Sequence, residues 1–157
     1  MTHAYFPTIL LTALALLLVS CGIEDVRQRT IANWKNATIA LLAPVWWWAN
    51  GLAFLPDMAM QLGVAVAIFA LFVGAFAIGQ MGGGDVKLIG ALALWLPVQP
   101  LVWMLIVMSI GGGLITMLMV IDRWRHGGRG AVETPYGVAI AIAGLISLRE
   151  PLFNPFT

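Results

Sequence analysis

Six apolar stretches, separated by short polar segments, dominate this chain and limit the folds that are open to it. They cover residues 4–22, 36–55, 59–80, 87–98, 101–121 and 135–149. A helix needs about 20 apolar residues to cross the hydrocarbon layer of a membrane, and most of these stretches approach that length. Hydrophobic residues make up 61% of the sequence and charged residues only 10%, whereas a soluble domain is about half apolar and about a quarter charged. We therefore expect an all-α, polytopic membrane helix bundle with about six transmembrane helices, residues 1–157 forming a single domain.

The fourth stretch is short for a full crossing. It is bounded by Pro97 and Pro100, and helices tend to end before proline. The distribution of positive charge nevertheless favours a crossing. With six crossings and the N-terminus outside, the cytoplasmic side holds all the basic residues but Arg149, namely Arg27, Arg29, Lys35, Lys87, Arg123, Arg125 and Arg129. A re-entrant fourth stretch would move the last three of these to the outer side, so the positive-inside rule favours six crossings in this orientation.

The second stretch has two possible registers, 36–55 or Ile31–Trp48. In the second register, Trp34 and the run Trp46-Trp47-Trp48 fall at the two membrane interfaces, where tryptophan is enriched. In the alternative interpretation the three adjacent tryptophans are bulky side chains that face lipid. The sequence does not choose between these registers.

Small residues and proline predict local features of two other stretches. Gly111-Gly112-Gly113 lies inside the fifth stretch, where glycines typically allow close approach of another helix, and Gly74 and Gly79 are expected to serve likewise. Thr134-Pro135 predicts an N-cap followed by proline at the first position of the last helix.

The N-terminal stretch carries a second possible meaning. Leu18-Val19-Ser20-Cys21 resembles a lipoprotein cleavage box, in which the cysteine would become a lipidated N-terminus. Residues 1–8 contain no Lys or Arg, however, whereas a signal peptide needs a basic first region. We therefore expect residues 4–22 to be a retained span and Cys21 to be a packing residue near a helix end.

Two aspartates lie at the edges of apolar stretches on the predicted cytoplasmic side. Asp25 follows the first stretch, and Asp85 follows Gly82-Gly83-Gly84, between the third and fourth. A carboxylate at a membrane boundary is costly unless it is paired or used, so each is a candidate functional residue. If the two meet, they share one proton over a range of pH: the ionised member can take a proton from water and the protonated one can hydrogen-bond a scissile carbonyl.

The surroundings of the aspartates leave a structural alternative open. Glycines beside Asp85 tolerate unusual dihedrals and would let an extended peptide approach, but the same residues also suit a flexible turn in which Asp85 is the N-cap of the fourth helix. Lys87 and Arg27 are close enough in sequence to bias the position of the shared proton, or they serve only as cytoplasmic anchors. The other acidic residues are interpreted as structural: Asp57, Asp122, Glu133 and Glu150.

Several other classes of chemistry lack support. The net charge of +1 argues against a nucleic-acid partner, and the single cysteine excludes an internal disulfide and a multi-cysteine zinc site. His3 and His126 lack metal-ligand spacing, and no phosphate loop, dinucleotide fingerprint or nucleophile elbow occurs. Ser20, Ser109 and Ser147 have no evident base partner, which argues against a serine peptidase. We expect no metal and no cofactor.

Three segments together resemble the type IV prepilin peptidase family. Asp25-Val26-Arg27-Gln28-Arg29-Thr30-Ile31-Ala32-Asn33 resembles the first aspartate motif of that family, in which Ile-Pro-Asn begins six residues after the Asp. Gly82-Gly83-Gly84-Asp85-Val86-Lys87-Leu88 resembles the second motif, Gly-x-Gly-Asp-x-Lys. Pro135-Tyr136-Gly137 resembles a segment at the start of the last helix of the family. The order and spacing agree over nearly the whole chain.

The resemblance implies a membrane aspartic endopeptidase of the bacterial inner membrane. Such enzymes remove the positively charged leader of prepilins and pilin-like proteins on the cytoplasmic side. It implies that Asp25 and Asp85 are the catalytic pair, that Gly82 and Gly84 shape the second site, that Lys87 supports it, and that Pro135-Tyr136-Gly137 packs near the centre.

Two departures limit what the resemblance implies. Ala32 replaces the usual proline of the first motif, and the cysteine-containing cytoplasmic insert of the larger, N-methylating members is missing. Methylation is therefore not implied, and the chain is most similar in size to the short members of tight-adherence (Flp) pilus systems.

Two non-enzymatic alternatives remain from the residues alone. A small transporter or a pilus-assembly subunit would use Asp25 and Asp85 to bind a proton or cation. A lipoprotein-anchored assembly factor would carry a lipid on Cys21.

Overall fold

The computed structural model describes residues 5–126 and 134–148, and nearly all of them are helical. The elements are α1 (Tyr5–Gln28), α2 (Asn33–Ala49), the short η1 (Phe54–Met58), α3 (Ala59–Ala77), α4 (Gly83–Trp95), α5 (Val98–His126) and α6 (Tyr136–Ser147). The described residues contain no strand, so the predicted all-α fold is confirmed.

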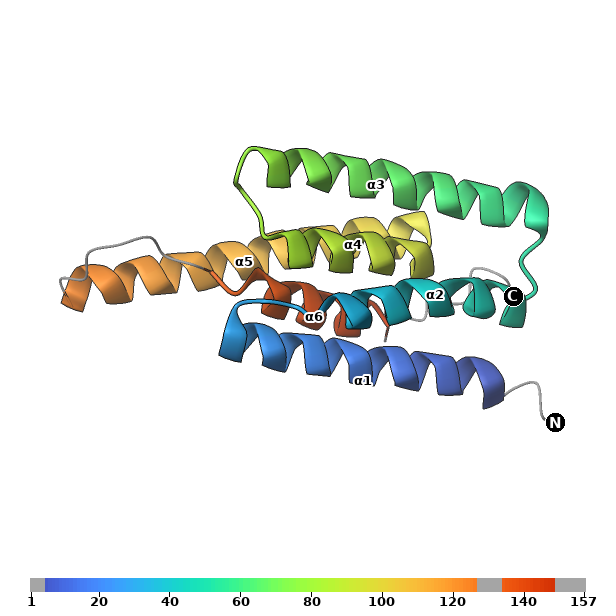
Figure 1. Ribbon diagram of the computed structural model, residues 1–157, viewed down its shortest axis with the longest axis horizontal. Helices are drawn as coiled ribbons and strands as arrows, with labels where there is room; N and C mark the ends of the chain where they lie inside the picture. The colour runs from blue at the N-terminus through green and yellow to red at the C-terminus, as the bar shows by residue number, and fades with distance from the viewer. Residues whose placement is uncertain (1–4, 127–133, 149–157) are drawn as a thin grey trace.

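Successive helices run in alternating directions, which brings three connections to one end of the bundle (Figure 1). The α1–α2 turn, the α3–α4 loop and the start of α6 all lie at this end, which we call the motif end. Both predicted aspartate motifs therefore lie at the motif end. The basic residues within the described ranges belong to segments at the same end: Arg27, Arg29, Lys35, Lys87, Arg123 and Arg125.

Three helical segments are long and apolar enough to cross a membrane, on length and composition alone. They are Tyr5–Gln28, Phe54–Ala77 and Val98–His126, and Tyr136–Ser147 is a shorter apolar helix. The predicted count of six crossings and the outside N-terminus stay predictions.

Helix α4 forms the centre of the packing although it is the shortest but one of the α-helices. It contacts α2, α3 and α6, while α1 and α5 pack on α6. Leu88, Ile89 and Leu92 of α4 are fully buried. Because small and apolar residues occupy nearly every position of α4, it can be covered on several sides at once.

The three adjacent tryptophans of α2 divide between the core and the surface. Trp46 stacks on Trp95 with ring centroids 5.6 Å apart, and Trp47 Nε1 donates to the Leu94 carbonyl at 2.7 Å. Trp48 is 72% exposed. The interpretation of all three as lipid-facing bulk is therefore wrong for Trp46 and Trp47, and only Trp48 is free to contact lipid.

Some helices extend beyond the ends of the apolar stretches, because their backbone hydrogen bonds continue through polar residues. Helix α1 continues beyond residue 22 to Gln28, so Asp25 lies in its last turns and not after the helix. Helix α2 begins at Asn33, near the earlier of its two predicted registers, and Cys21 is fully buried within α1 as expected of a packing residue. Helix α4 ends at Trp95, two residues before Pro97.

Two of the predicted roles for small and polar residues are not supported. Gly74 and Gly79 have no heavy atom within 4 Å of an added Cβ, and Gly79 has a φ of +74°, so neither makes a close helix contact. The N-cap of α6 is Pro135 and not Thr134, and the N-cap residue makes no side-chain capping hydrogen bond. The Thr134 hydroxyl instead accepts a hydrogen bond from Thr116 at 3.1 Å.

Candidate active site

Asp25 is 4% exposed and reaches from α1 to the first turn of α6. The backbone N–H of Val138 donates to Asp25 Oδ2 at 3.1 Å, and the N–H of Gly137 also bonds the carboxylate. The first N–H groups of a helix have no partner within the helix and carry partial positive charge, so they favour an anion. Asp25 therefore supplies the cap that Thr134 was predicted to supply, and it does so from another helix.

Asp85 lies in the first turn of α4, whose N-cap is Gly82. Its carboxylate folds back and accepts a hydrogen bond from the Gly82 N–H, as acidic residues at the third helical position do in a capping box. The structural alternative that made Asp85 itself the N-cap is therefore wrong, because the N-cap is Gly82, three positions earlier. Burial raises the pKa of Asp85 to about 7 from its ordinary 3.8, with a further increase from the charge of Asp25 and opposition from the Gly82 N–H.

Both carboxyl groups line one cavity at the motif end, with a volume of about 600 Å³. The α1–α2 turn, the α3–α4 loop and the start of α6 form its walls, through Gln28, Arg29, Thr30, Gly79, Gln80, Met81, Gly82, Thr134 and Tyr136. Two acidic groups whose charges interact can hold one shared proton, and a cavity of this size admits water and a segment of peptide.

Ile31 of the first motif packs against glycines of the second motif and of α6. A Cβ added to Gly84 would lie 3.3 Å from Ile31, and one added to Gly137 would lie 2.8 Å both from Ile31 Cδ1 and from Asp25 Cγ. None of the three glycines before Asp85 has a positive φ. Gly82 and Gly84 therefore allow close approach of Asp85 and Ile31, while Gly83 makes only ordinary contact with Phe76, and none of the three is needed for the unusual dihedrals that the sequence suggested.

A partly buried ion pair holds the α1–α2 turn. Lys35 Nζ lies 2.9 Å from Glu24 Oε2, and the same Glu24 oxygen accepts a hydrogen bond from the Ala32 N–H at 3.2 Å. Lys35 Nζ also donates to Ser20 Oγ at 2.7 Å and to the Ser20 carbonyl at 3.2 Å. Both oxygens of Ser20 therefore serve as acceptors in the network that joins α1 to the start of α2.

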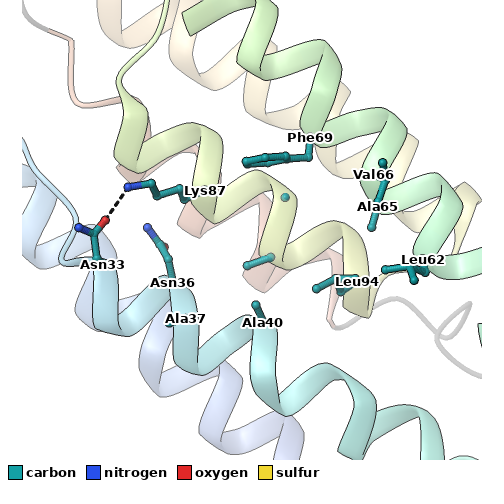
Figure 2. Close-up of a pocket in the computed structure, with 12 residues that line it drawn as sticks. Asn33, Asn36, Ala37, Ala40, Leu62, Ala65, Val66, Phe69, Lys87 and Leu94 are labelled. Atoms are coloured by element: carbon teal, nitrogen blue, oxygen red, sulfur yellow. Dashed lines mark hydrogen bonds between the residues drawn. The ribbon is translucent and has the colours of Figure 1, made fainter.

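Two asparagines connect the first motif with the second. Lys87 Nζ donates to Asn33 Oδ1 at 2.7 Å (Figure 2), and Asn36 Nδ2 donates to the Gly84 carbonyl at 3.2 Å. In the sequence, Lys35 was counted only among the cytoplasmic basic residues, and neither Glu24 nor Asn36 was a candidate. Glu24 lies just outside the first apolar stretch and Asn36 lies near the start of the second, and this position was the available signal, since polar groups there need partners.

The remaining predicted site residues divide between the cavity and the surface. The Tyr136 ring lies over Gly112, where an added Cβ would be 2.5 Å from the ring, so the central glycine of α5 allows this approach. Arg27 is exposed and does not line the cavity, whereas Arg29 does. Positions 25 and 29 share a helix face and position 27 does not. Arg29 has a φ of +54° and ends α1 in the left-handed conformation.

Asp57 and Asp122 do not line this cavity. Asp57 accepts a hydrogen bond from the Ala53 N–H at 3.1 Å, and Asp122 lies 3.2 Å from His126. Glu133 and Glu150 lie outside the described residues, as does His3. Within the part of the chain that the structure describes, no three His, Cys, Asp or Glu side chains come together in a way that could hold a metal ion.

Residues 12–117 match the model of the type IV leader peptidase family. The matched range includes Asp25, Asp85, Lys35 and both asparagines, and it ends before α6. No curated protein and no solved structure matches the chain.

Proposed function

Because this chain belongs to the type IV leader peptidase family and is a membrane protease of that kind, we propose that it is an aspartic endopeptidase that removes the leader peptide of type IV prepilins or pilin-like proteins. The catalytic groups in this proposal are Asp25, Asp85 and a water molecule. The observation that carries it is that both carboxyl groups, from motifs 60 positions apart, line one cavity.

The two environments divide the acid and base roles. Burial opposes ionisation of Asp25, but its two backbone N–H bonds at the start of α6 favour the carboxylate, and in this proposal Asp25 takes the proton of the attacking water. Asp85, with a pKa of about 7, holds a proton and donates it in a hydrogen bond to the scissile carbonyl. Attack of water on the carbonyl carbon then gives a tetrahedral intermediate. Transfer of the proton held by Asp25 to the departing amine breaks the C–N bond.

The proposed location follows from the charge distribution. Basic residues gather at the motif end, so the positive-inside rule favours a cytoplasmic position for the cavity. In this arrangement the protein crosses the bacterial inner membrane several times with its N-terminus outside. The cationic leader of the substrate remains in the inner aqueous layer.

The test is cleavage of a prepilin by the purified protein in liposomes, followed on a gel by the shift that accompanies leader loss. Asp25→Asn and Asp85→Asn should each insert and fold but lose about 10²–10⁴-fold in rate, the range for loss of general acid–base catalysis. Asp57→Asn, at an exposed acid outside the cavity, is the control and should cleave normally. Full cleavage by either dyad variant would disprove the assignment. If the wild-type protein cleaves no prepilin but moves protons or cations, the transporter alternative would replace it.

A further inference from the structure

A second cavity lies between α2, α3 and α4 and shares no lining residue with the cavity of the two aspartates. It has a volume of about 450 Å³ and is open on one side. Its floor is the buried pair Gly90 and Ala91 of α4, and the Phe69 ring of α3 lies over Gly90. Figure 2 shows the walls, with Ala37 and Ala40 on α2 facing Val66 and Phe69 on α3. We call this cavity the α2–α4 groove.

The lining of the α2–α4 groove has helical spacing on each wall. Positions 33, 37 and 40 contribute from α2, positions 62, 66 and 69 from α3, and positions 87, 90, 91 and 94 from α4. In a membrane, helices associate through close packing at small residues, because lipid tails are as apolar as the side chains. Three parallel stripes, two of them rich in Ala and Gly, therefore suit a further helix better than a flexible acyl chain.

One end of the groove is polar and contains an unsatisfied group. Asn36 is 3% exposed, and its Oδ1 has no hydrogen-bond partner. The orientation of its amide follows from its other bond, since the Gly84 carbonyl can only accept and must therefore face Nδ2. A buried carbonyl oxygen of this kind needs a donor, and an acyl chain has none.

Resting on the function proposed above, we propose that the α2–α4 groove receives the apolar helix of the substrate, with the first turn of that helix at the polar end. The first N–H groups of a helix are free, so one of them can donate to Asn36 Oδ1 once this covered oxygen turns toward the groove. The polar end also adjoins the second motif. Asn36 Nδ2 donates to the Gly84 carbonyl, and Lys87, which lines the groove, follows Asp85 by two positions. A helix seated in the groove thus delivers the residues before it to the dyad.

The test compares two substrates and two matched variants. Ala37→Trp fills the groove at an exposed alanine, and Ala70→Trp adds the same bulk at an exposed alanine of α3 outside it. Ala37→Trp should raise KM at least about tenfold for a full prepilin, equivalent to about 1.4 kcal/mol of binding. It should leave kcat/KM unchanged for a short peptide that has the cleavage site without the helix. Ala70→Trp should change neither.

Unchanged prepilin kinetics in Ala37→Trp, or equal losses on both substrates, would overturn the groove assignment. A lipid that is displaced from Ala37→Trp, with kinetics unaltered, would assign the groove to an acyl chain instead.

Cross-linking separates this proposal from the proposed function. Ala40→Cys, in Asp85→Asn protein, should form a disulfide with a cysteine in the apolar helix of the prepilin, and Ala70→Cys should not. A cross-link with a wild-type protein that cleaves nothing would retain the groove and reject the peptidase mechanism. Prepilin cleavage by the wild-type protein without this cross-link would retain the peptidase mechanism and reject the groove assignment.

Discussion

The backbone N–H of Val138 donates a hydrogen bond of 3.1 Å to Oδ2 of Asp25, which lies 113 positions earlier in the chain. This contact makes the proposed catalytic carboxylate a structural cap for the last helix. Gly137 is part of the same contact, since its N–H bonds Asp25 and its Cα approaches the carboxyl group. The orientation of Asp25 therefore depends on the close fit of α6 against α1.

Gly137→Ala should reduce prepilin cleavage by about 10²-fold, the loss that follows displacement of a reacting group by about 1 Å. The added Cβ would be 2.8 Å from Asp25 Cγ, and that carboxylate is held by two N–H groups and has little freedom to move. Gly113→Ala is the control, because nothing lies within 4 Å of its added Cβ. It should retain activity and gain up to about 1 kcal/mol of helix stability. Equal activity of the two variants would contradict the fit described here.

The convergence of the two aspartate motifs at one end of the bundle follows from features visible in the sequence. With helices that alternate in direction, the connection after the first and the connection after the third must lie at the same end. The Gly-x-Gly-Asp-x-Lys pattern and the clustering of basic residues indicated the same end. These features are local or periodic, so a single sequence reveals them.

The cap of α6 could not be predicted in this way. Thr134 followed by Pro135 is a good local signal for an N-cap, but the free N–H groups of α6 bind the Asp25 carboxylate, a charged acceptor from α1. The pairing of Glu24 with Lys35 likewise depends on how the α1–α2 turn folds back. Such contacts are set by tertiary packing, and no spacing rule connects the residues involved.

The tryptophan run of α2 offers a test of packing between neighbouring positions. Trp47→Phe should lower the free energy of unfolding by about 0.5–1.5 kcal/mol, because it leaves the Leu94 carbonyl without its Nε1 donor at 2.7 Å. Trp48→Phe removes the same N–H from a side chain that is 72% exposed, and should change stability little. Thermal or denaturant unfolding in detergent measures both. Equal destabilisation by the two variants would show that Trp47 does not lock α2 to α4.

The ion pair beneath the α1–α2 turn should be strongly coupled. Lys35→Met leaves the Glu24 carboxylate without its cation, which is more harmful than losing the pair as a whole. Glu24→Gln keeps an oxygen for the Ala32 N–H and should be milder. The double variant should therefore lose less thermal stability than the sum of the single variants, and it should recover part of the cleavage lost in Lys35→Met. Additive losses in a double-mutant cycle would contradict this coupling.

The protonation of Asp85 should control both activity and stability across neutral pH. Asp85 precedes the predicted fourth span, and its pKa of about 7, compared with an ordinary 3.8, means that the folded protein holds this proton more tightly than the unfolded chain. The stabilising effect of the bound proton is complete below pH 3.8 and is lost as the pH rises towards about 7. Prepilin cleavage should fall above about pH 7, because the proton that Asp85 donates to the scissile carbonyl is then missing. The melting temperature of the wild-type protein should fall relative to that of Asp85→Asn between pH 4 and pH 7, since the amide cannot ionise in the cavity, with Asp57→Asn defining the background. A wild-type activity that stays constant from pH 6 to pH 9 would show that Asp85 does not act in its protonated form.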